Sequence, residues 1–370
     1  GQSNNIKEFD SLGKNIMHNS CIYGHLLICQ WVFMLVPEFL SEVTTEESWT
    51  PMLLACANGH IDICEWLFEN GANEDIREDD GYGNTPLLVS CAHNQLHVCK
   101  WLLAMGASDD VCQTNYSGRS PLYWACGFGH LEVAQWLYQN GADQDIDKKC
   151  PNNISPMWIA CFQGRLSVCL WLQKMGALID IHSIRDDFED LTPLNNNCKE
   201  GHEEMCMWIL QQCQRRPREC DNYGRTPMYF ACANGMLVVC QKMFGLGACV
   251  LKSDNDDNCP MFTSCWGGHL EVCEWLYSVG ASSDVNKRNI HGNTPLSAAC
   301  YRGHLPVCVW LLEVNGTQDI AFEASNNRQR KQTPLFNAFW WGQLPICKWF
   351  IVNGFLNGSD RENVSDYVKD

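Results

Sequence analysis

The sequence predicts an all-α solenoid, a fold in which short helix pairs stack in a row and each pair contacts only its neighbours. Three periodic features support this prediction. Nine Pro residues follow a Thr, Ser or Cys at steps of 33 to 39 residues, a Trp recurs near the same step, and a Gly closes most of the units. At 370 residues the chain is also too long for one ordinary compact core.

Each repeat is expected to form two short helices joined by a tight turn. In the second repeat Thr50 suits the helix N-cap and Pro51 the first helical position, so helix one begins there. Gly59 breaks that helix, and apolar residues at helical spacing then predict helix two over residues 61–67. Gly71 suits a left-handed cap at its end. A polar stretch rich in Asp, Asn and Gly leads to the next repeat.

These units resemble the ankyrin repeat. The resemblance rests on Thr85-Pro86-Leu87, on the run Gly129-His130-Leu131-Glu132-Val133 and on Gly141-Ala142-Asp143, and it recurs in about ten repeats over roughly residues 14–357. It implies stacked helix-turn-helix units, finger-like loops between repeats and a concave face that binds protein partners. We therefore expect an N-terminal tail at 1–13, a single array at 14–357 and an acidic C-terminal tail at 358–370.

Charge and hydropathy narrow the classes of partner. The net charge is −17 and the isoelectric point is about 5.0, so the chain lacks the basic surface that grips a phosphate backbone, and anionic lipid would repel it. The longest apolar stretch, Leu26 to Val36, is too short to span a bilayer. We expect protein partners with a basic segment, no nucleic acid and no membrane insertion. The oligomeric state stays open.

Cysteine is unusually frequent, with 24 residues, of which eighteen fall in two registers of the repeat. The helix-one register contains Cys21, Cys56, Cys91, Cys126, Cys161, Cys198, Cys232, Cys265 and Cys300. The helix-two register contains Cys29, Cys64, Cys99, Cys169, Cys206, Cys240, Cys273, Cys308 and Cys347. Their spacing of eight residues differs from that of zinc sites, so we interpret them as reduced core residues without metal. The Trp of each second helix is likewise expected in the core between repeats.

The sequence contains no set of residues typical of catalysis. Because a Ser/His/Asp set, a P-loop and a dinucleotide fingerprint are all missing, we expect neither enzyme activity nor a cofactor. Hydrogen bonds between neighbouring repeats are expected from the His of the Gly-His step, namely His25, His60, His130, His202, His269 and His304. Solvated turns are expected at Asp79-Asp80, Asp109-Asp110, Asp186-Asp187 and Asp256-Asp257.

The partner-binding residues are expected on the concave face, at the positions between the helix-one Cys and the following Gly. Aromatic residues beside an Arg are typical of interface hot spots. The candidates there are Phe128, Phe162, Trp266, Tyr301, Arg302, Trp340 and Trp341, and the fingertips add Tyr82, Tyr116 and Tyr223. The alternative interpretation is that some of these rings only cover the Trp residues of helix two.

The leading functional hypothesis is a non-catalytic protein–protein interaction scaffold or adaptor. The alternative is a fixed structural subunit, or spacer, in a larger multiprotein assembly. So many buried thiols would favour an intracellular, reducing compartment, and the cytoplasm is the expected location.

Overall fold

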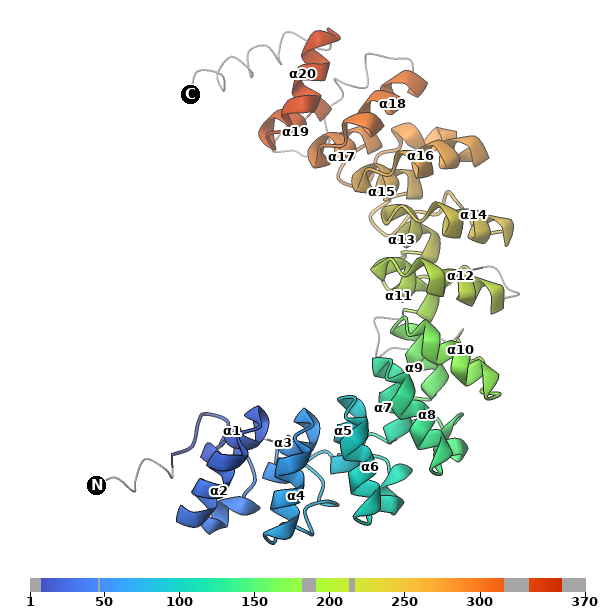
Figure 1. Ribbon diagram of the computed structural model, residues 1–370. Helices are drawn as coiled ribbons and strands as arrows, with labels where there is room; N and C mark the ends of the chain where they lie inside the picture. The colour runs from blue at the N-terminus through green and yellow to red at the C-terminus, as the bar shows by residue number, and fades with distance from the viewer. Residues whose placement is uncertain (1–7, 46, 182–190, 213–216, 316–332, 355–370) are drawn as a thin grey trace. The chain divides into compact units, whose positions relative to one another are not determined.

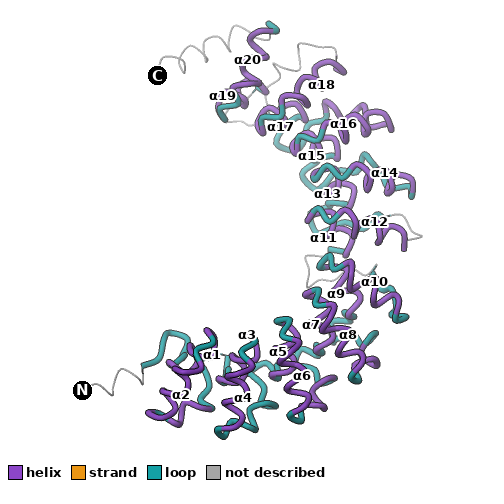
Figure 2. Tube along the Cα trace, in the orientation of Figure 1, coloured by secondary structure: helices purple, strands orange, loops and turns teal. Residues whose placement is uncertain are grey.

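The computed structural model describes residues 8–45, 47–181, 191–212, 217–315 and 333–354. These residues form twenty α-helices in successive pairs and no strand (Figures 1 and 2). The chain divides into two compact units, residues 1–181 and 182–370, with ten helices in each. The predicted all-α solenoid of helix pairs is therefore confirmed. That both units act as one uninterrupted array over 14–357 stays a prediction, and the acidic tail at 358–370 lies outside the described residues.

Within each unit the first helix of every repeat packs on the first helix of the next repeat, and each second helix covers its own first helix. The first helices of residues 1–181 are α1 (Ile16–Tyr23), α3 (Pro51–Asn58), α5 (Pro86–Ala92), α7 (Pro121–Phe128) and α9 (Pro156–Phe162). Their second helices are α2 (Leu26–Leu35), α4 (Ile61–Glu69), α6 (Leu96–Ala104), α8 (Leu131–Gln139) and α10 (Leu166–Lys174).

The second unit repeats this arrangement. Its first helices are α11 (Pro193–Glu200), α13 (Pro227–Ala233), α15 (Pro260–Gly267), α17 (Pro295–Arg302) and α19 (Pro334–Trp340). Its second helices are α12 (Glu203–Gln212), α14 (Leu237–Gly245), α16 (Leu270–Leu276), α18 (Leu305–Asn315) and α20 (Leu344–Val352). Hence the two helices that the sequence predicts for each repeat are both present.

The Thr-Pro step starts the first helix as predicted. The Oγ1 atom of Thr50 accepts a hydrogen bond of 3.1 Å from the backbone N–H of Leu53, and Pro51 occupies the first helical position. Such a cap contributes about 1 kcal/mol to helix stability. In α15 the capping residue is Cys259, which makes no side-chain cap bond. This helix therefore begins on the fixed φ of Pro260 and on packing.

At seven described repeat boundaries a side chain from the following repeat bonds to the backbone beside the turn that ends the first helix. Gly59, at φ 78°, ends α3 in the left-handed region, and a Cβ there would lie 2.3 Å from Oε1 of Gln95. Because this Gly lacks a Cβ, Gln95 reaches over it and donates to the carbonyl of Ala57 at 3.3 Å. We call this contact the inter-repeat pin. The described pins run from His60, Gln95, His130, Arg165, His269, His304 and Gln343.

The expected role of the Gly-His step is confirmed for four of its six His residues. His60, His130, His269 and His304 each contact a backbone carbonyl of the preceding repeat at 2.9 to 3.0 Å. The prediction is wrong for the other two. His25 belongs to the first repeat, whereas Nδ1 of His202 contacts Oδ1 of Asn197 within its own repeat at 3.1 Å. Asn234 of the following repeat donates to the carbonyl of Cys198 at 2.8 Å.

The Trp residues of the second helices pack across repeat boundaries, as predicted, but most are only half-buried. Trp66 lies edge-to-face against Phe33 of the preceding repeat, with ring centroids 5.7 Å apart. Equivalent pairs join Phe68 to Trp101, Tyr138 to Trp171, Phe244 to Trp275 and Tyr277 to Trp310. Such pairs contribute about 0.5–1.5 kcal/mol beyond area burial. Trp31, in the first repeat, remains 47% exposed.

We predict that acidification weakens the inter-repeat contacts. Burial lowers the pKa of His130 and of His304, so each favours its neutral form in the folded chain. Their stabilisation is present above the ordinary histidine pKa of about 6.5 and is lost as the pH falls. The urea midpoint should therefore fall between about pH 7.5 and about pH 5.5. In the variant His130→Gln/His304→Gln, both His residues are replaced by Gln, which makes the same kind of pin at position 95 and does not titrate. On acidification this variant should therefore lose less stability than the wild type. If the urea midpoints of the wild type and the variant fall equally, the loss of stability does not come from these two His residues.

Candidate functional site

The structure brings five of the predicted partner-binding residues together in the second unit. Trp266 of α15 stacks on Tyr301 of α17, with centroids 5.1 Å apart and ring planes 17° apart. Tyr301 in turn contacts Trp341, with centroids at 4.7 Å. The Cζ atom of Arg302 lies 5.4 Å from the Trp266 ring centroid, and Trp340 is exposed beside them at the end of α19. We call these five residues the aromatic cluster.

The aromatic cluster faces solvent. The side chains of Trp266, Trp340 and Trp341 are 40%, 45% and 53% exposed, and Tyr301 is half-buried between them. The alternative interpretation, that these rings only cover the Trp residues of the second helices, is not supported here. Those Trp residues have their own partners, such as the pairs of Trp275 with Phe244 and Trp310 with Tyr277.

Two further rings, which sequence reasoning missed, extend the aromatic cluster. Phe262 stacks on Trp266 at 6.5 Å and Phe336 stacks on Trp340 at 5.8 Å, in both cases one helical turn earlier. Residues four apart share one face of a helix, so the spacing of these aromatic pairs is a signal that could have found them.

A smaller aromatic group lies in the first unit around Phe128. Its ring stacks on Trp124 at 5.4 Å, again four residues earlier in the same helix. The Cζ atom of Arg119 lies 5.2 Å from the Trp124 centroid. Phe128 is 46% exposed, as predicted, whereas Trp124 and Arg119 were not among the expected residues. Both groups therefore combine stacked rings with a guanidinium.

Phe162 corrects the expectation of a solvent-facing ring. It is only 7% exposed, because it stacks in parallel on Trp158 with centroids 5.0 Å apart, and Trp158 is fully buried. The same four-residue spacing leaves Phe128 exposed on a half-buried Trp124, whereas here the second ring is buried with the first. Phe162 is therefore not available at the surface, in contrast to the other candidates.

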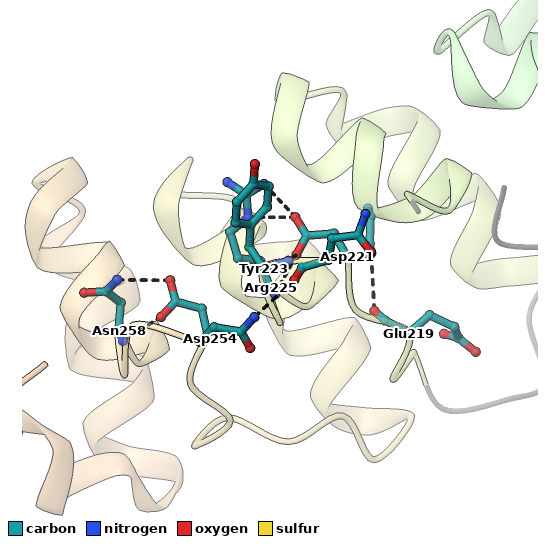
Figure 3. Close-up of polar contacts among 9 residues, drawn as sticks. Glu219, Asp221, Tyr223, Arg225, Asp254 and Asn258 are labelled. Carbon is teal, nitrogen blue, oxygen red and sulfur yellow. Dashed lines mark hydrogen bonds and ion pairs between the residues drawn. The ribbon is translucent and has the colours of Figure 1, made fainter. Parts of the chain in front are cut away.

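The fingertip Tyr residues are exposed and belong to a common turn. In the second unit Oδ1 of Asp221 accepts hydrogen bonds from the backbone N–H groups of Tyr223 and Arg225, at 3.0 and 2.8 Å (Figure 3). Its Oδ2 accepts from Nε of Arg225 at 2.7 Å, and that guanidinium lies 4.6 Å from the Tyr223 ring centroid. The next finger uses Asp254 and Asn258 in the same way (Figure 3).

The fingers of the first unit place Tyr82 and Tyr116 next to each other. The backbone N–H of Tyr116 donates to the carbonyl of Tyr82 at 3.0 Å, and the Tyr116 hydroxyl donates to Asp79 at 3.1 Å. Tyr82 is 58% and Tyr116 75% exposed. They occupy the fingertips, separate from the stacked rings of the first helices.

The paired carboxylates correct the expectation of solvated turn residues. Asp80 and Asp110 are buried, at 3% and 1% exposure, whereas Asp256 and Asp257 are exposed. Asp80 is buried because its Oδ1 accepts from the N–H groups of Tyr82 and Asn84, which closes the finger turn. Burial raises the pKa of Asp110, although Arg77 lies 3.4 Å from its Oδ1. The pair Asp186-Asp187 lies outside the described residues.

The in-register Cys residues form close thiol pairs inside the repeats. In eight repeats the Sγ atoms of the two registers lie 3.4 to 3.9 Å apart as free thiols, for example Cys56 and Cys64 at 3.6 Å. All eighteen in-register residues are buried, as predicted. Burial raises the pKa of thiols such as Cys56 and Cys232 well above the ordinary range, so they stay protonated. Protonated thiols are poor metal ligands.

Two searches of the described residues bear on other site classes. In this part of the chain no three His, Cys, Asp or Glu side chains are grouped as a metal ion would require. Nor does any described helix combine the length and the apolar character needed to cross a bilayer. The six off-register cysteines differ among themselves: Cys150 and Cys259 are buried, Cys112 and Cys220 are partly exposed, Cys249 is exposed and Cys213 is not described.

The chain belongs to the ankyrin-repeat family. A family model described as ankyrin repeats in three copies matches residues 2–78, 73–150, 106–183, 157–254, 198–289 and 261–360. The family resemblance stated from the Thr-Pro and Gly-His steps is thereby confirmed. Ankyrin repeats are generic modules for protein–protein interaction.

We predict that thiol reactivity divides the cysteines by burial. With a thiol-specific reagent the native chain should react rapidly at exposed Cys249, and the in-register thiols should react only after unfolding in urea. Replacement of Cys249 by Ser should remove about one rapidly reacting thiol per chain and leave the slow fraction unchanged. Rapid labelling of Cys56 or Cys64, identified by peptide mass mapping, would show that the pairs are accessible.

Proposed function

We propose that this protein is a non-catalytic interaction scaffold or adaptor, and that it binds a partner protein through the first-helix side of its repeats, the concave side in the family. The aromatic cluster is the observation that carries this proposal. Trp266, Tyr301 and Trp341 form a continuous row of rings across three successive repeats, on the side that the second helices leave uncovered.

The composition of the cluster supports a protein partner. Large rings with few rotatable bonds, together with an Arg, are enriched among residues that dominate binding free energy. Their mutual stacking fixes the rings before a partner arrives, so little conformational entropy remains to be lost on binding. Isolated exposed apolar residues need no functional explanation, but a row of three rings in contact is a contiguous patch.

A basic segment of a partner would fit the fingers of the first unit. Residues 74–80 contain Glu74, Asp75, Glu78, Asp79 and Asp80 against the single cation Arg77. Negative charge of this density attracts a basic chain at long range, and the attraction weakens with salt. The exposed rings of Tyr82 and Tyr116 stand beside these carboxylates and would contact such a segment. The proposed location is an intracellular, reducing compartment, because the paired thiols are free.

A fixed structural subunit of a larger assembly remains the second candidate. It would use the same surface, but with a permanent partner. Size-exclusion chromatography of the protein from its native source distinguishes the two candidates. A free pool of the chain supports the adaptor, whereas a constant stoichiometry with one partner supports the structural subunit.

We predict that truncating the cluster abolishes partner capture. The variant Trp266→Ala/Tyr301→Ala/Trp341→Ala should lose about tenfold or more in affinity for proteins captured by the wild type, because aromatic hot spots each contribute roughly 2 kcal/mol or more. Quantitative mass spectrometry of crosslinked native extracts measures the loss. Far-ultraviolet circular dichroism should show unchanged helix content.

The matched control is Phe244→Ala. Phe244 is an aromatic residue with 40% exposure, in a second helix of the same unit, so the substitution removes a comparable ring from the other side. Capture by this variant should equal that of the wild type. If the triple variant still captures the same proteins at the same ratio, the first-helix side is not the binding surface.

A further inference from the structure

The aromatic cluster borders a cleft in the second unit. The cleft has a volume of about 290 Å³ and lies along α15, α17 and α19. Its aromatic walls are Phe262, Trp266, Tyr301, Trp340 and Trp341. Binding pockets for whole small molecules begin at roughly this size. A cleft of this volume therefore suits a few residues of an extended peptide better than a large ligand.

The cleft exists because one repeat lacks a ring that its neighbours have. Ser297 of α17 occupies the register position of Phe262 in α15 and Phe336 in α19, three residues after each helix-capping residue. The small side chain leaves space in the row of rings. The Ser297 hydroxyl completes the capping box of its own helix by accepting from the backbone N–H of Thr294 at 2.9 Å. It also donates to the carbonyl of Thr294 at 2.8 Å. Ser297 therefore contributes only a small side chain to the cleft, and its hydroxyl already has hydrogen-bond partners.

Asn337 contributes a polar side chain to the cleft. Asn337 of α19 lines the cleft and is only 7% exposed, and its side-chain amide makes no hydrogen bond within the described residues. The amide atoms are not fully buried, so they are open to the cleft and can bond to a ligand that enters it. A carboxamide offers two N–H donors and one carbonyl acceptor. Its natural complement is another amide, such as the backbone peptide group of an extended chain.

The charges around the cleft further restrict the chemistry of a group that can bind there. Among the described residues, no carboxylate lines the cleft. The guanidinium of Arg302 lies against Trp266 at its border, and no ion pair to Arg302 is found in the described part of the chain. A cationic side chain placed on these rings would be repelled by Arg302. A neutral group on the rings and a carboxylate near Arg302 would be favoured.

We propose that this cleft binds an extended, proline-containing segment of a partner protein that carries an acidic residue beside its prolines. This inference rests on the proposed function and names the partner chemistry at its main surface. Proline rings are flat, neutral and apolar, and they dock between aromatic side chains. A polyproline II segment makes no internal hydrogen bonds, so its carbonyl groups are free to accept from Asn337. The neighbouring carboxylate pairs with Arg302.

Calorimetric titration of the full chain with synthetic peptides tests the proposal. The probe is a blocked peptide with a Glu-Pro-x-x-Pro core, and its controls replace both prolines by Ala or the Glu by Lys. We expect the probe to bind and each control to bind roughly tenfold or more weakly, because each loses one of the two recognised features. Two further probes test other ligands that aromatic rings could bind. A twelve-nucleotide oligothymidine tests for stacked bases, and a trimethyllysine peptide tests for a cation.

Three variants locate the binding. Asn337→Leu fills the polar position and should weaken the Glu-Pro peptide roughly tenfold. Arg302→Glu should exchange the preference, so that the Lys-Pro peptide binds better than the Glu-Pro peptide. Phe244→Ala is the control and should bind like the wild type. Helix content by circular dichroism verifies folding. If Asn337→Leu does not fold, the charge exchange by Arg302→Glu decides alone.

The possible failures are distinguishable. Equal binding of the proline and alanine peptides, absence of the charge exchange, or tight binding of the oligonucleotide or trimethyllysine peptide without the proline peptide would each overturn the proline assignment. If capture of partner proteins still depends on Trp266, Tyr301 and Trp341 in that case, the proposed function stands and only the partner chemistry is wrong. If capture is also independent of these rings, both proposals are wrong.

Discussion

The inter-repeat pin is the contact on which the repeat-to-repeat geometry depends. At seven described repeat boundaries one side chain reaches back over the left-handed turn residue of the preceding repeat and bonds to a backbone carbonyl. That turn residue is a Gly at six of these boundaries and Asn94 at the seventh. The pin combines two conditions: a turn residue in the left-handed region, usually a Gly whose missing Cβ leaves the path clear, and a donor of suitable length. His, Gln and Arg all meet the last condition, so the donor varies while the geometry persists.

The pin also explains why the rings of the aromatic cluster lie in register. The carbonyl that accepts from His304 belongs to Trp266, and the carbonyl that accepts from Gln343 belongs to Tyr301. Each ring is therefore attached to a backbone position that the next repeat holds in place. Stacking of Trp266 on Tyr301 at 5.1 Å follows from this shared anchoring. A structural bond and a surface for recognition thus meet at the same residue.

Most of the fold could be predicted from the sequence, because its signals are local and repeated. Thr50-Pro51 starts a helix through a side-chain cap, and Gly59 ends it through its φ angle, so neither depends on distant contacts. The site could be predicted less completely. The exposure of Phe162 depends on whether Trp158 beneath it is buried, and the cleft depends on a small Ser297 between two Phe positions. The residue type and position of Asp80 indicate a turn, but they do not indicate that the turn buries its carboxylate. These properties arise from packing between repeats, which periodicity does not specify.

The edge-to-face pairs of the second helices make the chain an intrinsic optical reporter. Each of Trp66, Trp101, Trp171, Trp275 and Trp310 contacts a ring from the repeat before it. Separating two neighbouring repeats removes that ring and admits water to one indole edge. A single-tryptophan variant that keeps one of these residues therefore converts the opening of one chosen boundary into a red shift of its emission. The same pattern that joins these repeats lets five of the junctions be observed one at a time.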